Sequence, residues 1–291
     1  MSALRPVIGV FDSGFGGLTV LREIVRYVPN AEYLYFGDTA RLPYGAKSVE
    51  TVARYAVGAC HFLEDQGAEQ LVIACNTATA LAMDQIHTYA HVPAIGVVEP
   101  GAKSAAAITQ TKNVAVIGTE ATIASHAYQR ALEKLGIQAN EKATPLLVPL
   151  VEEGWVDHTV TQQVAEIYLR DQFVRTDRRC DVLLLGCTHY PLIRPLLRRV
   201  VPTEVSIVDS AESTARALAQ KLGVGPRPAA SAGSTQSSGA RAASAPSAPE
   251  PTPGSPDFRF YVTDSVQKFR RLGSNFLGHP VDNVEHVDLG G

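Results

Sequence analysis

The sequence predicts an α/β protein with two similar halves, each a doubly wound parallel sheet. Short apolar runs alternate with longer segments of helical periodicity, a pattern typical of parallel sheets covered by helices on both faces. This alternation starts again near residue 113. Two similar steps, ACNTATA at 74–80 and GCTHYPL at 186–192, each follow a buried apolar run. The repetition indicates an internal duplication, and hence two pseudo-symmetric domains.

The first half alternates strands and helices in a regular order. Its first helix presents Leu18, Leu21 and Ile24 on one face, and Pro29 and Asn30 stop it. We expect strands at 7–11, 32–38, 70–75 and 94–98, with helices at 16–29, 48–65 and 77–90.

The second half repeats this order. Segment 113–136 reads as strand, turn and helix, so that 116–119 parallels 10–13. The strand at 182–185, followed by Cys187, parallels the strand at 71–73, followed by Cys75. Because the two cysteines hold the same place in the two halves, we expect them at equivalent strand ends.

A low-complexity segment interrupts the pattern late in the chain. Residues 224–256 are almost entirely Gly, Ala, Ser, Pro and Thr, so we expect a flexible, disordered insertion with little to bury. A strand at 258–264 and a helix at 265–278 follow it. The insertion therefore interrupts a domain or tethers its last piece.

Composition excludes several classes of partner. The chain has 291 residues, enough for two domains, and its formal charge of −3 predicts neither a nucleic-acid nor an anionic-membrane surface. We find no apolar run of transmembrane length and no signal peptide, so we expect a cytoplasmic protein. The four cysteines form no C-x-x-C and are interpreted as reduced thiols, with Cys60 and Cys180 structural.

Polar clusters follow four of the predicted strands. In open α/β sheets, ligands bind beyond the carboxyl ends of the strands, and the helix that follows each cluster offers free N–H groups. This arrangement suits a small ligand that carries carboxylates. The clusters are Asp12-Ser13-Gly14, Cys75-Asn76-Thr77, Thr119-Glu120 and Cys187-Thr188-His189.

The paired cysteines indicate either a redox pair or two acid/base groups. A disulfide needs Cα atoms within about 7 Å, whereas thiols at the mouths of two domains more naturally stand on opposite sides of a ligand. Inverting a carbon stereocentre requires one group to remove a proton from one face and another to deliver a proton to the opposite face. A thiol, with an ordinary pKa of about 8.5, can do both.

Each thiol needs help to act as a base, because only a few per cent of an ordinary thiol is ionised at pH 7. Asp12 could relay a proton near Cys75 or orient the substrate amine, or it could simply cap a helix. His189 could stabilise a thiolate at Cys187, or be an ordinary strand-end histidine. Glu152 could add a carboxylate, or be a solvated loop acid.

Other chemistries are less well supported by the residues. DSGFGG at 12–17 resembles a phosphate-binding turn, but its spacing is not G-x-G-x-x-G and no Walker lysine follows, so we interpret its glycines as a tight turn near a ligand. His87 and His91 lie four apart on a helix without a third metal ligand. Lys47 and Lys103 lack a pyridoxal signature. We expect neither metal nor cofactor.

Six motifs, in their order, make the chain resemble the glutamate racemases of the cofactor-independent aspartate/glutamate racemase superfamily. The resemblance covers residues from about 7 to 222 and resumes after the insertion. The motifs are GVFDSGFGGLTVL, YFGDTARLPYG, ACNTATA, VIGTEAT, PLVEEG and GCTHYPL.

The resemblance implies an active site between two α/β domains, formed by 1–98 with 210–291 and by 99–209. It implies interconversion of L- and D-glutamate for peptidoglycan synthesis. Cys75 and Cys187 would be the acid/base thiols, assisted by Asp12, Glu152 and His189. The implied substrate contacts are Asp12, Ser13, Pro43, Tyr44, Gly45, Asn76, Thr77, Thr119, Thr188 and His189.

Some alternatives stay open on the sequence. Aspartate racemases and related thiol-dependent isomerases or decarboxylases of the superfamily also use paired cysteines, and one methylene is worth only about 1–3 kcal/mol in a pocket. A two-domain dicarboxylate-binding protein with idle cysteines is the non-enzymatic alternative. We expect a homodimer. Some relatives bind DNA gyrase, but no feature of this sequence indicates such a surface.

Overall fold

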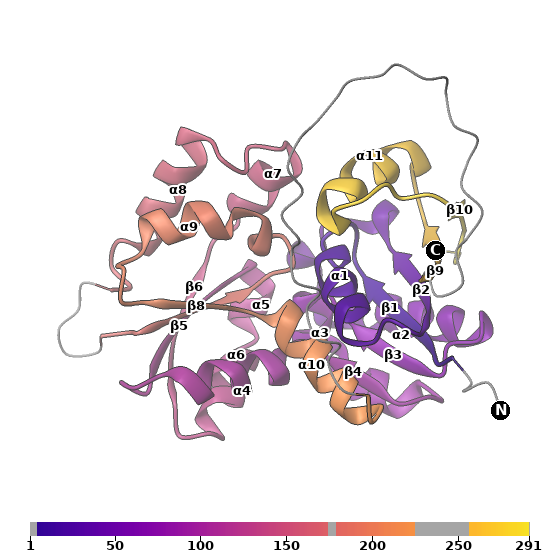
Figure 1. The fold of residues 1–291 in the computed structure, drawn as a ribbon, viewed down its shortest axis with the longest axis horizontal. Helices are drawn as coiled ribbons and strands as arrows, with labels where there is room; N and C mark the ends of the chain where they lie inside the picture. Colours follow the sequence, from indigo (N-terminus) through magenta and orange to yellow (C-terminus); the bar gives the residue numbers. More distant parts are fainter. Residues whose placement is uncertain (1–4, 174–178, 225–255, 291) are drawn as a thin grey trace, which may run out of the picture.

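The computed structural model describes residues 5–173, 179–224 and 256–290. The chain forms two parallel sheets, each with helices on both faces, in two lobes that lie next to each other (Figure 1). The predicted α/β fold class is confirmed. Among the described residues, no helix combines the length and the apolar character needed to cross a bilayer.

The first sheet has six strands in the order β10-β9-β2-β1-β3-β4, and all neighbouring pairs are parallel. The second has four parallel strands in the order β6-β5-β7-β8. The strands are β1 (Val7–Asp12), β2 (Glu32–Gly37), β3 (Gln70–Ile73), β4 (Ala94–Gly96), β5 (Asn113–Gly118), β6 (Gln138–Ala143), β7 (Val182–Gly186), β8 (Ser206–Asp209), β9 (Asp257–Val262) and β10 (Val284–His286).

The two sheets share one topology. In each half the first strand lies between the second and the third, giving the orders β2-β1-β3-β4 and β6-β5-β7-β8. The strand order therefore reverses between β1 and β3, and again between β5 and β7. Such switch points are where open α/β sheets bind ligands. The polar clusters at the ends of these four strands thus lie at the two switch points.

Helices cover both faces of the first sheet because its central strand is apolar on both sides. Val10 of β1 belongs to the core under α1 (Leu18–Tyr27) and α11 (Val266–Leu277), whereas its neighbour Phe11 packs under α2 (Val49–Asp65) and α3 (Asn76–Tyr89). Successive side chains of a strand point to opposite faces, so the unbroken apolar run at 7–11 serves two cores. The helix α10 (Ser210–Lys221) packs mainly on α1.

The second sheet is covered in the same way, with α4 and α6 on one face and α7, α8 and α9 on the other (Figure 1). Three short 3₁₀ turns, η1 (Thr39–Arg41), η2 (Tyr44–Ala46) and η3 (Tyr190–Ile193), follow strand ends. The remaining helices are α4 (Val98–Ile108), α5 (Glu120–Ala124), α6 (Ala127–Glu133), α7 (Leu147–Glu152), α8 (Thr159–Leu169) and α9 (Arg194–Val200).

Three strands end two residues earlier than predicted, and one of them is β9, predicted to end at 264 and ending at Val262. The strand predicted at 70–75 ends at Ile73, because Cys75 is already the N-cap of α3 and its Sγ accepts the N–H of Ala78 at 3.4 Å. The strand predicted at 94–98 ends at Gly96, because α4 begins at Val98. The early start of α3 places Cys75 at a helix N-terminus.

The domain boundaries stay a prediction. Strands of the first sheet come from 7–96 and 257–286, and those of the second from 113–209. The predicted division, 1–98 with 210–291 and 99–209, is one way to assign the connections between them. The insertion predicted at 224–256 lies, except for its two end residues, outside the described residues.

Candidate active site

A cavity of about 460 Å³ lies where the carboxyl ends of both sheets meet. Ser13 follows β1, Cys75 follows β3, Thr119 follows β5 and Cys187 follows β7, and all four line this one cavity. Every predicted site residue except Asp12 contributes to its wall. These wall residues are Ser13, Pro43, Tyr44, Gly45, Cys75, Asn76, Thr77, Thr119, Glu152, Cys187, Thr188 and His189.

Cys75 is held at the N-terminus of α3. Its thiol donates to Ser13 Oγ at 3.4 Å, and its Sγ accepts the N–H of Ala78. The residue is only 5% exposed. Burial, together with the negative charge of Asp12, raises the pKa of the Cys75 thiol to about 12, although the bonds from Ser13 and Ala78 oppose this. Cys75 is therefore a thiol at neutral pH.

Asp12 lies behind the wall and is 1% exposed. Its Oδ2 accepts the N–H of Gly14 at 2.8 Å, while its Oδ1 is buried and has no hydrogen-bond partner. Burial raises the pKa of this carboxyl above its usual range, against the opposing charge of His189. The helix-cap alternative is wrong, because the N-cap of α1 is Gly17 and makes no side-chain cap bond.

His189 links Cys187 to Glu152 in a chain of three side chains. Its Nδ1 lies 3.8 Å from Cys187 Sγ, and its Nε2 lies 3.0 Å from Glu152 Oε1. The imidazole also packs edge-on against the ring of Phe276, with centroids 5.2 Å apart. Glu152 is the last residue of α7, so α7 and the end of β7 together hold the imidazole in place.

Electrostatics make His189 a cation. Burial alone would lower its pKa, but the hydrogen bonds and charges of Cys187 and Glu152 outweigh burial and raise the pKa to about 10. For Glu152, burial is likewise outweighed by His189 and by the charge of Lys268, so its pKa falls below the usual range. The two cavity cysteines thus have different neighbours: a carboxylate near Cys75 and an imidazolium beside Cys187.

Hydroxyl and amide groups join the two halves around the cavity. Thr77 Oγ1 lies 2.9 Å from Thr119 Oγ1, and Tyr128 Oη donates to Asn76 Oδ1 at 2.6 Å. Asn76 Nδ2 is buried without a hydrogen-bond partner. A buried donor of this kind beside a cavity is available to an acceptor such as a carboxylate.

Comparison with known proteins agrees with this geometry. Residues 8–218 match the Asp/Glu/Hydantoin racemase family. The chain belongs to the Asp/Glu/hydantoin racemase family. The resemblance inferred from the sequence motifs is confirmed.

Relatives of this racemase family match along the whole chain. A glutamate racemase from Koribacter versatilis is 80% identical over 291 residues, the full length of both chains. The solved structure of glutamate racemase isoform RacE1 from Bacillus anthracis has a TM-score of 0.83 at 33% identity and covers 98% of each chain. That of glutamate racemase from Francisella tularensis in complex with D-glutamate has a TM-score of 0.81 at 34% identity, also covering 98% of each chain.

Two polar residues of this racemase cavity, Thr39 and Lys268, were not predicted as site residues, and Glu120 was predicted only as part of a polar cluster at a strand end. Lys268 lies on α11, in the first turns after β9. Lys268 lies just beyond the carboxyl end of β9. The rule that ligands bind beyond the carboxyl ends of the strands would therefore have predicted it as a site residue. Because the strand lies beyond the insertion, the sequence did not connect it with the two cysteine motifs.

The other residues weighed from the sequence lie elsewhere in this racemase fold. His87 and Lys103 line a second cavity of about 530 Å³, between α3, α4 and α6. Lys47 is the C-cap of η2. Cys60 is fully buried in the core under α2, as predicted for a structural thiol. His91 pairs with Glu64 and not with His87.

Gly16 of the glycine-rich turn packs against the second half of the chain. A Cβ on Gly16 would lie 2.1 Å from Thr188 Oγ1 and 2.6 Å from His189 Nδ1. Gly16 is therefore required by close packing of the first half against the GCTHYPL segment of the second. The expected approach of this turn to a ligand stays a prediction.

Proposed function

We propose that this protein interconverts L- and D-glutamate by a cofactor-independent, two-thiol mechanism. The observation that carries the proposal is that Cys75 and Cys187, from equivalent strand ends of two duplicated halves, line the same cavity. The family membership and the glutamate racemases it resembles over its full length support glutamate as the substrate. The expected supply of D-glutamate for peptidoglycan, and a cytoplasmic location, belong to the same proposal.

The mechanism uses the different surroundings of the two thiols. The imidazolium of His189 stabilises a thiolate at Cys187, and Cys75 begins as a thiol. The Cys187 thiolate removes the α-proton from one face of glutamate, and the Cys75 thiol delivers a proton to the opposite face. Cys187 ends as a thiol and Cys75 as a thiolate, so the product complex is ready for the reverse reaction and the protons balance.

Neighbouring groups determine how readily Cys75 becomes a thiolate. Ser13 and the N–H of Ala78 favour the thiolate, while the charge of Asp12 disfavours it. Because the Asp12 carboxyl has a raised pKa, it can hold a proton and so remove this repulsion while Cys75 is ionised. The unpartnered Oδ1 of Asp12 is available for a further hydrogen bond, which we assign to the substrate amine or a relay.

Substrate binding is assigned to the polar wall that the sequence predicted. The two carboxylates of glutamate would be held by N–H and O–H groups of 43–45, Asn76, Thr77, Thr119 and Thr188. Lys268 adds a positive charge to the wall. Dimerisation, and the unsupported possibility of gyrase binding, stay predictions.

The decisive experiment incubates the purified protein with L-glutamate in D₂O and without pyridoxal phosphate. We expect optical rotation to decay to zero and the product to carry deuterium at Cα. L-aspartate, measured in parallel, should react with a kcat/KM lower by roughly 10- to 200-fold, because it lacks one methylene. Constant optical rotation of L-glutamate at high enzyme concentration would refute the proposal.

A further inference from the structure

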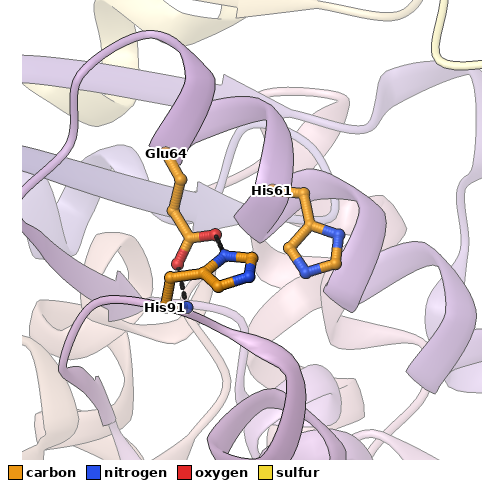
Figure 2. A group of neighbouring side chains, drawn as sticks. All are labelled: His61, Glu64 and His91. Carbon is orange, nitrogen blue, oxygen red and sulfur yellow. Dashed lines mark hydrogen bonds and ion pairs between the residues drawn. The ribbon is translucent and has the colours of Figure 1, made fainter.

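A cluster of metal-ligating side chains lies outside the active site. His61, Glu64 and His91 each place one nitrogen or oxygen atom within 4.8 Å of the others. Figure 2 shows the Glu64 carboxylate against one edge of the His91 ring, and the His61 ring on the other side of it. This proximity needs an explanation, because two imidazoles lie together at a half-exposed surface.

The fold brings the three residues together from two elements. His61 and Glu64 are one turn apart on α2 and so share one face of the helix. His91 follows the end of α3, just before β4 begins at Ala94. Both helix ends lie at the amino edge of the first sheet. The cluster therefore lies at the edge opposite the cavity that contains the cysteines.

Hydrogen bonds fix the orientation of these side chains. Glu64 accepts the backbone N–H of His91 at 2.6 Å and that of Val92 at 3.0 Å, and its Oε2 lies 2.9 Å from His91 Nδ1. His61 Nε2 lies 2.9 Å from the carbonyl oxygen of Tyr89. A carbonyl only accepts, so this bond places the His61 proton on Nε2, the ring nitrogen that lies nearer His91 in Figure 2, and a metal ion bound there would replace the bond to Tyr89.

We propose that His61, Glu64 and His91 form a binding site for a divalent first-row transition-metal ion such as Zn²⁺. Two imidazoles and a carboxylate are an established ligand set for zinc, with bonds of about 2.0–2.2 Å. The ligand atoms of tetrahedral zinc lie about 3.3 Å apart. The imidazole centroids are 5.4 Å apart and the rings are inclined by 31°, so small side-chain rotations bring the ligands to this spacing.

An ordinary ion pair does not account for all three residues. A protonated His91 beside Glu64 would explain that contact alone. The second imidazole would then have only its bond to Tyr89, and its protonation would repel His91. A metal ion uses both rings in their neutral form, and the backbone bonds that hold Glu64 in place are the outer contacts that orient a metal ligand.

Metal binding at this site should stabilise the fold without taking part in the proposed chemistry. The ion would add a further link between α2 and the connection between α3 and β4, which the bonds of Glu64 and His61 already join. A ligand that binds only the folded state raises the melting temperature. Because the site is at the opposite edge of the sheet, its ligands do not line the active-site cavity.

The test is calorimetric titration of the full chain with Zn²⁺. Thiols of the active site also bind zinc, so the titration uses the Cys75→Ser/Cys187→Ser variant as parent. We expect His61→Ala and His91→Ala to weaken binding by at least about 10-fold. His87→Ala, which changes an exposed histidine on α3 outside the cluster, is the matched control and should bind like the parent.

Co²⁺ provides a second measurement on the same parent. Visible bands of tetrahedral cobalt without a sulfur charge-transfer band are expected, and they should disappear in His61→Ala but persist in His87→Ala. Zinc affinity of His61→Ala equal to that of the parent would overturn the proposal, as would a cobalt spectrum with thiolate ligation. None of these readouts depends on racemisation, so failure here is separate from failure of the proposed function.

Discussion

At the scale of single residues, the two cavity thiols differ in what surrounds them. Cys75 lies near a buried carboxylate that disfavours its ionisation, whereas Cys187 lies beside an imidazolium that favours it. The imidazolium in turn depends on Glu152, which bonds His189 Nε2. The proposed mechanism uses this difference between the surroundings of the two thiols.

Removing the charge of Glu152 should shift the pH dependence of activity. The neighbours of His189 raise its pKa from about 6.5 to about 10 in the folded state. The stability that its protonation contributes is therefore fully present below about pH 6.5 and is lost as the pH rises through about 10. Glu152→Gln should move the alkaline limb of kcat/KM to lower pH by about 1–3 units. The measurement is a pH–rate profile of kcat/KM.

Glu153→Gln is the matched control for this change. Glu153 is the exposed C-cap residue of α7, next to Glu152 in the chain. Its profile should coincide with that of the wild type. An alkaline limb that stays unmoved in Glu152→Gln would mean that Glu152 does not set the protonation of His189.

At the scale of elements, the turn between β1 and α1 is shaped by the second half of the chain. Gly16 packs so closely under Thr188 and His189 that no Cβ fits. Thr19 Oγ1, in the first turn of α1, donates to the carbonyl oxygen of Thr188 at 2.9 Å. The position of the GCTHYPL segment therefore depends on a residue in DSGFGG.

Gly16→Ala and Gly58→Ala should have opposite effects. Gly16→Ala overpacks the contact with Thr188 and should lower the free energy of unfolding by about 1–3 kcal/mol, with a loss of activity because His189 is displaced. Gly58 lies within α2 with no atom within 4 Å of an added Cβ, so Gly58→Ala should stabilise by about 0.5–1 kcal/mol. Denaturant titration and steady-state kinetics measure both.

The contact at Gly16 would be of no consequence if Gly16→Ala kept wild-type stability and kcat/KM. Gly58→Ala shows that the assay detects an added methyl group in an open position. The pair therefore separates steric conflict at the site from a general effect of glycine replacement.

Strands, and the sites at their ends, could be predicted where one short stretch of sequence determines them. The apolar runs at 7–11 and 182–185 predict buried strands, and a Cys-polar step after a strand predicts a site at its end. The sequence could not predict that Glu152 meets His189, since the two are 37 residues apart and α7 has to be placed first. Nor could it predict the Gly16 contact, which depends on how the two halves pack.

At the scale of the whole molecule, the proposed active site is a cavity lined by residues of both halves. Tyr128, from the second half, bonds Asn76 of the first, and Thr119 meets Thr77 in the same way. These contacts lie at the cavity, so stability and function are coupled there. The duplicated strand order explains why equivalent positions of the two halves face each other.

Tyr128→Phe tests this junction. It removes the donor to Asn76 Oδ1, a buried bond of 2.6 Å, and should lower the free energy of unfolding by about 1–3 kcal/mol. Activity should fall as well, because Asn76 lines the cavity. Tyr89→Phe, at a residue that is 58% exposed, is the control and should be neutral. Wild-type stability and kinetics for Tyr128→Phe would show that this bond does not hold the halves together.

The central claim is that the two thiols address opposite faces of one carbon, and single-cysteine variants test it most directly. Cys75→Ser and Cys187→Ser are each incubated with L-glutamate and with D-glutamate in D₂O, and deuterium at Cα is followed. Cys60→Ala, which alters a buried thiol of α2 that does not line the cavity, should keep racemisation and serves as control.

We predict that both variants lose racemisation, and that each retains exchange with only one enantiomer, a different one for the two variants. The surviving thiol can still remove and return a proton on its own face. Equal residual exchange of both enantiomers in both variants would contradict the account.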